Sequence, residues 1–224
     1  MHCKSLGIDK PMLGSVLWLL IHFVMPDEPE NNLKIVWQDI VREYDELGTV
    51  NRYGFMRQTM FTTKSQPKLR GKAGEVKDLG PVILRIWRKY HNPNLLTHLK
   101  ILMILEGSAH MDEILEAHPS DFALPPEQAD DLIATAFIYL RTWYEVFLHF
   151  KALELPLFGL TGKGHILLHA CLLSRSGVRH HKNMTRVHFI CVFSFSVAFR
   201  FFGQYKKKLE QRQTTTKDNT LVIL

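Results

Sequence analysis

The chain has 224 residues, of which 46% are hydrophobic, and its 28 Lys and Arg against 22 Asp and Glu give a net charge of +6. This length allows a core of ordinary size, and this hydrophobic fraction excludes a wholly disordered chain. The three cysteines, Cys3, Cys171 and Cys191, form no C-x-x-C pair, so neither a disulfide framework nor a thiolate zinc site is expected. A reducing, intracellular location, in the nucleus or the cytoplasm, follows as the expectation.

The first apolar stretch, MLGSVLWLLIHFVM, runs from Met12 to Met25. It follows two lysines, as the apolar part of a signal peptide would. However, it contains His22, lacks a small-residue cleavage site and, at 14 residues, is too short to span a bilayer. We therefore predict a buried helix in an N-terminal segment 1–26 and no stable membrane insertion, with a targeting role as the alternative.

The next region begins with a clear helix signal. Pro29 stands in an acidic first turn, apolar residues recur from Leu33 to Tyr44, and Gly48 is a stop signal. From residue 49 to 80, Gly, Pro, Ser, Thr and Lys are mixed, which predicts a long loop. Pro81 then predicts the start of another helix.

The longest periodic stretch lies between Pro93 and Pro119. Its apolar residues predict one buried helix face: Leu95, Leu99, Leu102, Leu105 (or Ile101), Met111, Ile114 and Leu115. A second helix is predicted from Pro126, and the short connection favours an antiparallel hairpin over residues 94–152.

These elements predict an all-α or nearly all-α fold, a helical bundle with a long antiparallel hairpin. The predicted helical domain covers 1–176, with a helical region at 27–155 and, within 156–176, a histidine-containing helix from about Lys163. The basic and aromatic tail 177–224 loses amphipathic order and is predicted to be poorly ordered. Its apolar run 187–202 could form a strand pair, a helix or nothing stable.

Positive charge gathers in two blocks. Residues 64–89 carry eight Lys and Arg against two acidic residues, and residues 175–224 carry ten against two. Such blocks can neutralise the phosphates of nucleic acid, although a solvated loop and a disordered tail are the alternative. The candidate nucleic-acid contacts are Lys64, Lys68, Arg70, Lys72, Arg85, Arg88 and Lys89.

The octet KGHILLHA places His165 and His169 one helical turn apart, so both imidazoles could face one metal ion. The zinc-protease motif needs Glu after the first His, where this chain has Ile166, and no third ligand is evident. We predict a packed or hydrogen-bonded pair, with no metal and no cofactor. GLTGKG lacks the spacing of a phosphate loop, and Asp112 and Glu113 diverge by about 100° on a helix, so no enzyme activity is expected.

Two motifs resemble a known family. MHCKSLG, through Met1, His2, Leu6 and Gly7, resembles the Met-His-x-x-x-Leu-Gly segment of CACTA-like cut-and-paste transposases with an RNase-H-like catalytic domain. KGHILLHA, through Lys163, His165, Leu168 and His169, resembles their later K-x-H-x-L-L-H segment. Residues 1–175, in blocks such as SQPKLRGKAGEVKDLGPVILRIWRKYHNP, are similar to a multicopy dinoflagellate protein family derived from such elements.

The resemblance implies that 27–155 corresponds to a helical insertion in these transposases. It also implies two metal-binding carboxylates. One would precede the Met-His pair, and this chain begins at Met1. The other would follow the second motif, where this chain reads SGVRHHKNMTRVHFICVFSF. The expectation is a catalytically incompetent transposase-like fragment, with a nucleic-acid-binding helical module as the alternative.

Overall fold

The computed structural model describes residues 4–62, 66–118 and 123–174, and every regular element among them is helical. In chain order the elements are η1 (Ser5–Asp9), α2 (Lys10–Leu19), η2 (Leu20–Val24), α3 (Pro29–Glu46), η3 (Gln58–Met60), α4 (Ala73–Tyr90), α5 (Leu96–Ala117), α6 (Pro126–Ala152) and α7 (Lys163–Leu173). They belong to one compact unit, Met1–Arg175. The predicted all-α fold is confirmed. The predictions for 177–224, including the run 187–202, lie outside the described residues.

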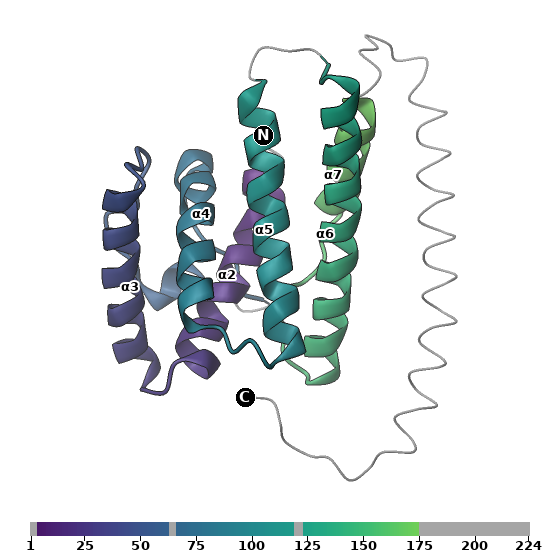
Figure 1. Ribbon diagram of the computed structural model, residues 1–224. Coiled ribbons are helices and arrows are strands. Elements are labelled where there is room, and N and C mark those ends of the chain that lie inside the picture. Colours follow the sequence, from purple (N-terminus) through teal and green to yellow (C-terminus); the bar gives the residue numbers. More distant parts are fainter. Residues whose placement is uncertain (1–3, 63–65, 119–122, 175–224) are drawn as a thin grey trace, which may run out of the picture. The chain divides into compact units, whose positions relative to one another are not determined.

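Helices α3, α4, α5 and α6 stand side by side in chain order, and α7 packs on α6 (Figure 1). The elements η1, α2 and η2 follow one another without a break and lie behind this row. They contact α3 through η2, α4 along most of their length, and α7 through η1. The N-terminal helix is therefore the central element around which the others assemble.

This N-terminal helix is buried on most of its surface, as predicted. Met12, Leu13, Leu17 and Leu20 are each no more than 1% exposed, as expected for a helix that is apolar all round. Ser5–Val24 is long and apolar enough to cross a membrane by length and composition, yet 67% of the apolar window is buried within the fold. The continuous helix extends beyond the apolar stretch that starts at Met12, because η1 and the first residues of α2 precede it within the predicted segment 1–26.

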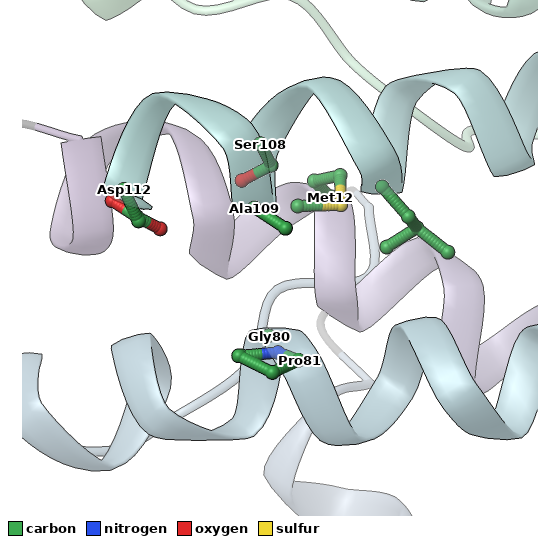
Figure 2. A pocket seen from close by; sticks show the side chains of 7 residues that line it. Met12, Gly80, Pro81, Ser108, Ala109 and Asp112 are labelled. Atoms are coloured by element: carbon green, nitrogen blue, oxygen red, sulfur yellow. The ribbon is translucent and has the colours of Figure 1, made fainter. Parts of the chain in front are cut away.

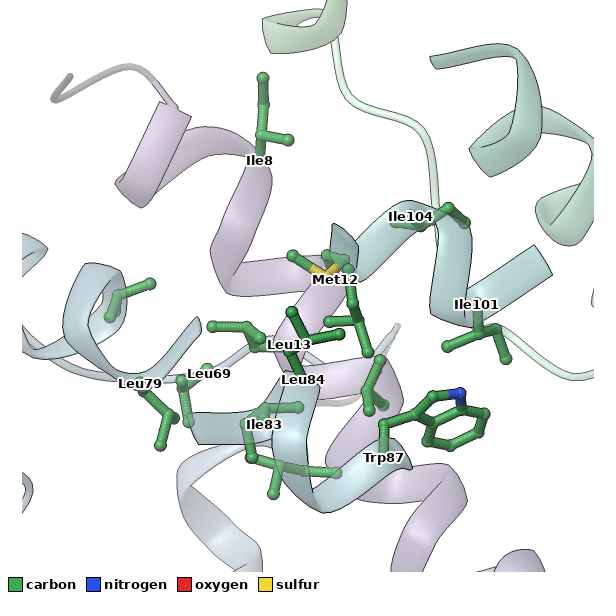
Figure 3. Close-up of a cluster of buried hydrophobic side chains, with 14 of the residues drawn as sticks. Ile8, Met12, Leu13, Leu69, Leu79, Ile83, Leu84, Trp87, Ile101 and Ile104 are labelled. Carbon is green, nitrogen blue, oxygen red and sulfur yellow. The ribbon is translucent and has the colours of Figure 1, made fainter. Parts of the chain in front are cut away.

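The centre of the core lies where this helix meets α4 and α5 (Figure 3). The indole of Trp87 is fully buried there, and its Nε1 donates a hydrogen bond to the backbone oxygen of His98 at 3.1 Å. A buried tryptophan contributes a large apolar area and usually finds a partner for its N–H. Labelled side chains of this cluster include Met12, Leu13, Ile83, Trp87, Ile101 and Ile104.

Helix α3 has the predicted start and stop. Gly48, just beyond its end, has φ +61°, a conformation that glycine adopts readily. Asn32, near the start of α3, is fully buried, and its Nδ2 donates to the backbone oxygens of Ile21 and Met25 at 2.9 and 3.3 Å. These carbonyls belong to the end of the N-terminal helix, where carbonyl groups lack intrahelical partners. Asn32 therefore ties α3 to the central helix.

The prediction of a loop up to residue 80 and a helix start at Pro81 was wrong. Helix α4 begins at Ala73 and contains Pro81 in its interior. A proline inside a helix removes one hydrogen bond and costs about 3 kcal/mol. Val76 and Leu79, both fully buried, place the first turns of α4 in the core. Their burial offsets the cost of the proline, which local sequence signals could not show.

The segment before α4 is held against the central helix. The backbone N–H of Leu69 donates to the oxygen of Lys10 at 2.9 Å, and that of Lys68 donates to Phe61 at 2.9 Å. A Cβ atom at Gly14 would lie 2.8 Å from the Leu69 nitrogen, so glycine permits this close approach. Lys68 therefore occupies a defined position beside the start of α2.

The predicted hairpin is confirmed: α5 and α6 pack antiparallel along their length (Figure 1). The predicted buried face of α5 was partly wrong, because Leu99 is 37% exposed while Ile104 and Ser108, which were not predicted, face the core. The predicted residues Leu105, Met111 and Ile114 are buried, and so is the alternative Ile101. Because the apolar run ILMIL is continuous, its pattern allows more than one face of α5 to be buried. Packing against the neighbouring helices decides which face is buried.

Helix α7 begins at Lys163, as predicted. The segment before it is anchored at Phe158, whose backbone oxygen accepts from Trp143 Nε1 at 2.6 Å and whose N–H donates to Ser15 Oγ at 2.9 Å. Ser15 lies on α2 and Trp143 on α6. These bonds fix the start of α7 next to the N-terminal helix.

Candidate functional site

The two motif segments, more than 150 residues apart in the chain, meet in space. Thr161 Oγ1 donates to the backbone oxygen of Gly7 at 3.2 Å. A Cβ atom at Gly7 would lie 2.7 Å from Lys163 Cγ, so only glycine leaves room for this lysine stem. Met1 and His2 lie outside the described residues, and Leu168 is buried as a packing residue.

An open groove of about 460 Å³ lies at this junction, which we call the motif groove. Its lining combines two glycines, two lysines and small apolar or hydroxyl side chains: Leu6, Gly7, Lys68, Thr161, Gly162, Lys163 and Ile166. Lys68 and Lys163 are both exposed. Among the described residues, neither forms an ion pair with a carboxylate. The groove therefore presents positive charge to solvent.

A third lysine adds to this charge. Burial lowers the pKa of Lys10, and the positive charge of Lys68 lowers it further, although Glu75 acts in the opposite direction. Like charges that influence one another in this way lie close together. Lys10 therefore adds positive charge beside Lys68, while Lys68 and Lys163 line the motif groove.

The other members of the predicted basic block divide into two groups. Arg70 and Lys72 are exposed in the segment before α4, and Lys64 lies outside the described residues. Arg85, Arg88 and Lys89 lie on the last turns of α4 and are held by carboxylates. Arg85 Nη1 lies 3.2 Å from Glu43 Oε2, and Arg88 Nη2 lies 2.7 Å from Glu106 Oε1. Much of the predicted block is therefore neutralised within the fold.

Lys89 belongs to a charged centre around Asp39. Its Nζ lies 2.7 Å from Asp39 Oδ2, the same oxygen that accepts from the hydroxyl of Tyr90 at 2.7 Å. Burial alone would raise the pKa of Asp39, but the hydrogen bonds from Lys89 and Tyr90 and the charge of Arg42 lower it. The hydrogen bond to Asp39 likewise raises the pKa of Lys89. This centre joins α3 to α4.

The two motif histidines face each other on α7. The Nε2 atoms of His165 and His169 lie 2.8 Å apart, and the rings are nearly perpendicular at 81°. One ring donates and the other accepts, as the prediction of a hydrogen-bonded pair required. Both side chains are half-buried.

A second charged centre, which sequence reasoning missed, surrounds Lys4. Lys4 Nζ donates to Asp9 Oδ2 at 3.1 Å, to Asp112 Oδ2 at 2.6 Å and to Ser108 Oγ at 2.8 Å. Lys4 and Asp9 are each only 3% exposed. The ammonium group thus occupies the space between two carboxylates, one from η1 and one from α5.

Charge in this centre is unbalanced, because two carboxylates share one lysine. Burial opposes the charge of Lys4, but Asp9 and Asp112 outweigh it and raise the Lys4 pKa. Burial raises the pKa of Asp112, and the negative charge of Asp9 adds to this effect against the attraction of Lys4. Burial raises the pKa of Tyr139, whose hydroxyl has no hydrogen-bond partner among the described residues, and the charges of Asp9 and Asp112 add to this effect.

A small cavity adjoins this centre between α2, α4 and α5 (Figure 2). Its volume is about 10 Å³, which is room for about one water molecule. Polar atoms reach it from Ser108 and Asp112, and the rest of its lining is Met12, Gly80, Pro81, Leu105 and Ala109. It is too small for a cofactor.

Other catalytic chemistry finds little support in the described part of the chain. There, no three His, Cys, Asp or Glu side chains converge as a metal site. Cys171 is a buried free thiol, and burial raises its pKa to about 11, so the thiolate form is disfavoured. Asp112 and Glu113 diverge as their spacing predicted: Asp112 turns inward, while the side chain of Glu113 is 76% exposed.

A signal for the Lys4 centre was present in the sequence. Lys4 and Asp9 are charged residues at the edge of a strongly apolar helix, where burial requires a partner. Their spacing of five residues is unusual for an α-helical pair, and the π-helical turn Ser5–Asp9 brings them together. Asp112 could not be found in this way, because it comes from a helix 100 residues away.

Comparisons of the chain with protein-family models, with curated proteins and with solved structures found no match.

Proposed function

We propose that this chain is a catalytically inactive helical module of transposase ancestry. The observation that carries the proposal is the position of the Lys4 ammonium group between Asp9 and Asp112. These two carboxylates are the acidic pair that the fold brings together from distant segments into a buried site.

Two-metal phosphoryl transfer requires carboxylates that converge on divalent cations. Here the ammonium group already donates to both carboxylates and to Ser108. A divalent ion would have to displace a buried lysine whose raised pKa keeps it protonated. This arrangement uses Asp9 and Asp112 to hold the fold together, and both carboxylates are engaged by Lys4 rather than by a divalent ion.

The test is a nicking and joining assay of the full chain on supercoiled plasmid with Mg²⁺ or Mn²⁺. We expect no metal-dependent cleavage. The matched control is the double variant Asp9→Asn, Asp112→Asn. Metal-dependent nicking by the wild-type chain that this double variant lacks would contradict the proposal.

Nucleic-acid binding is the second candidate function, favoured by the basic surface of the motif groove. Lys68 and Lys163 line it and Lys10 lies beside Lys68, while Arg85, Arg88 and Lys89 are paired with carboxylates. We therefore propose that nucleic acid contacts the motif groove and not the end of α4. Arg70 and Lys72 are exposed and close in sequence to Lys68, so they are further candidates for contact with phosphates. This role would agree with the intracellular location expected from the sequence.

The affinity of the full chain for a short DNA duplex, measured by fluorescence anisotropy at several salt concentrations, tests this role. Each neutralised phosphate contributes about −0.9 to the slope of log affinity against log salt. Phosphate contacts from Lys10, Lys68 and Lys163 would therefore give a slope of about −2.7. Absence of binding at low salt, or an affinity that salt does not change, would remove the candidate.

A further inference from the structure

The histidine pair on α7 has a geometry that neither proposed function uses. We propose that His165 and His169 form a binding site for a divalent transition-metal ion, with Cu²⁺ as the preferred ion. This inference goes beyond the prediction of a hydrogen-bonded pair, and it does not depend on the proposed function.

The separation of the two nitrogens supports this choice of ion. Bonds from imidazole nitrogen to such a metal are about 2.0–2.1 Å long. Two nitrogens 2.8 Å apart would subtend an angle of about 86° at the metal with bonds of that length. Square-planar and tetragonal sites, which Cu²⁺ and Ni²⁺ prefer, need neighbouring ligands near 90°. A tetrahedral Zn²⁺ site would need the nitrogens about 3.3 Å apart. Affinity for nitrogen ligands also peaks at Cu²⁺ among these ions.

Binding requires a change of tautomer at one ring and a rotation of both rings. In the hydrogen-bonded pair, one Nε2 carries a proton and the other accepts it. When the metal binds, the donor ring takes the form with its proton on Nδ1, and both rings turn so that their Nε2 lone pairs point from the line between the nitrogens toward the ion. The proton is relocated by exchange with solvent, both rings stay neutral, and one hydrogen bond is replaced by two nitrogen–metal bonds.

The helix holds the two rings in place. Leu167 and Leu168, on the face of α7 that meets the core, are at most 7% exposed and set the rotation of the helix. His165 and His169 lie on a flank that remains partly open to solvent. Within the described residues no third ligand completes a cluster. Two imidazoles from the described residues leave the other positions around the ion to water or to other ligands, as in a labile site rather than a closed structural site.

The experiment is a titration of the full chain with Cu²⁺, followed by calorimetry and by electron paramagnetic resonance. The expected spectrum contains coupling to two equatorial nitrogens. Removing a group that only supports a metal ligand lowers affinity about 10-fold to 100-fold. We expect His165→Ala and His169→Ala each to cause at least such a loss at this site. His149→Ala, which alters an exposed histidine on α6, is the matched control and should leave the titration unchanged.

Circular dichroism of each variant, together with His169→Gln, which keeps a polar side chain, separates loss of a ligand from loss of the fold. A folded His169→Gln variant should also lose the two-nitrogen signal. The proposal is overturned if folded variants at either position bind Cu²⁺ with the same affinity and the same spectrum as the wild-type chain. It is also overturned if the wild-type chain shows no site that these variants lack.

Discussion

The two buried charged centres of this fold have opposite balances of charge. Around Lys4, two carboxylates share one ammonium group, and the pKa of Asp112 is raised. Around Asp39, one carboxylate is shared by Lys89, Arg42 and the hydroxyl of Tyr90, and its pKa is lowered. Burial raises the pKa of both carboxyl groups, so the neighbouring charges and hydrogen bonds decide whether the pKa is finally raised or lowered.

Lysines that pair with carboxylates of the fold are not available to an anionic ligand. Lys4 and Lys89 both neutralise carboxylates of the fold, although Lys4 is buried and the side chain of Lys89 is 48% exposed. The motif groove differs from both centres, because its lysines lie near one another. Position in a basic stretch of sequence is therefore a poor guide to the charge available at the surface.

The largest effect is expected when the Lys4 centre loses its ammonium group. Lys4→Ala leaves Asp9 and Asp112 without the cation that pairs with both of them, and breaking a buried ion pair in this way costs about 3–5 kcal/mol. Urea unfolding measures this loss. Asp112→Asn is the matched control, because the Lys4–Asp9 pair remains and an amide oxygen can still accept, so its cost should be about 1 kcal/mol. Equal losses of unfolding free energy in the two variants would contradict the conclusion that Lys4 neutralises both Asp9 and Asp112.

Stability against pH should separate the two centres. A raised pKa for Asp112 means that the folded state binds its proton more tightly than the unfolded state, so this group adds stability as pH falls toward 3.8. A lowered pKa for Asp39 means that its contribution is present above pH 3.8 and is lost as pH falls further. As pH falls from 7 to 4, the free energy of unfolding of the wild-type chain should therefore rise relative to that of Asp112→Asn. Relative to Asp39→Asn, it should lose stability below pH 4. Urea unfolding at a series of pH values gives both differences, and trends of the same sign would contradict the assignment.

Nucleic-acid binding should distinguish the groove from the end of α4. The double variant Lys68→Gln, Lys163→Gln removes two exposed cations and should reduce the salt slope by about 1.8. Arg88→Gln is the control, because its guanidinium group already pairs with Glu106. Equal effects of both changes in the anisotropy titration would show that the whole basic block binds, as the sequence alone predicted.

The smallest effect is expected at the exposed partner of Asp39. Lys89→Ala removes an ion pair whose cation is 48% exposed, while Arg42 and Tyr90 remain on the same carboxylate. Exposed pairs of this kind contribute about 0.2–1 kcal/mol. A loss of unfolding free energy as large as that of Lys4→Ala would show that Arg42 and Tyr90 cannot replace Lys89 as partners of Asp39.

Local signals in the sequence predicted the fold class and most helices. The starts of α3, α6 and α7, the stop at Gly48 and the α5–α6 hairpin all agree with the structure. The predictions failed where packing outweighs a local rule, as at Pro81 inside α4 and at the exposed Leu99 of α5. In both places the sequence allowed two arrangements of similar local quality, and neighbouring helices selected one.

For the candidate site, the sequence identified the individual lysines and histidines but not their relations. The i, i+4 spacing of His165 and His169 already determined that the rings share one face of a helix. That Lys68 meets Lys163, that Arg88 meets Glu106, and that Lys4 lies between Asp9 and Asp112 was decided only by the tertiary structure. The physical reason is range: helix propensity and periodicity act over a few residues, whereas electrostatic pairing and burial depend on which distant segments share a core.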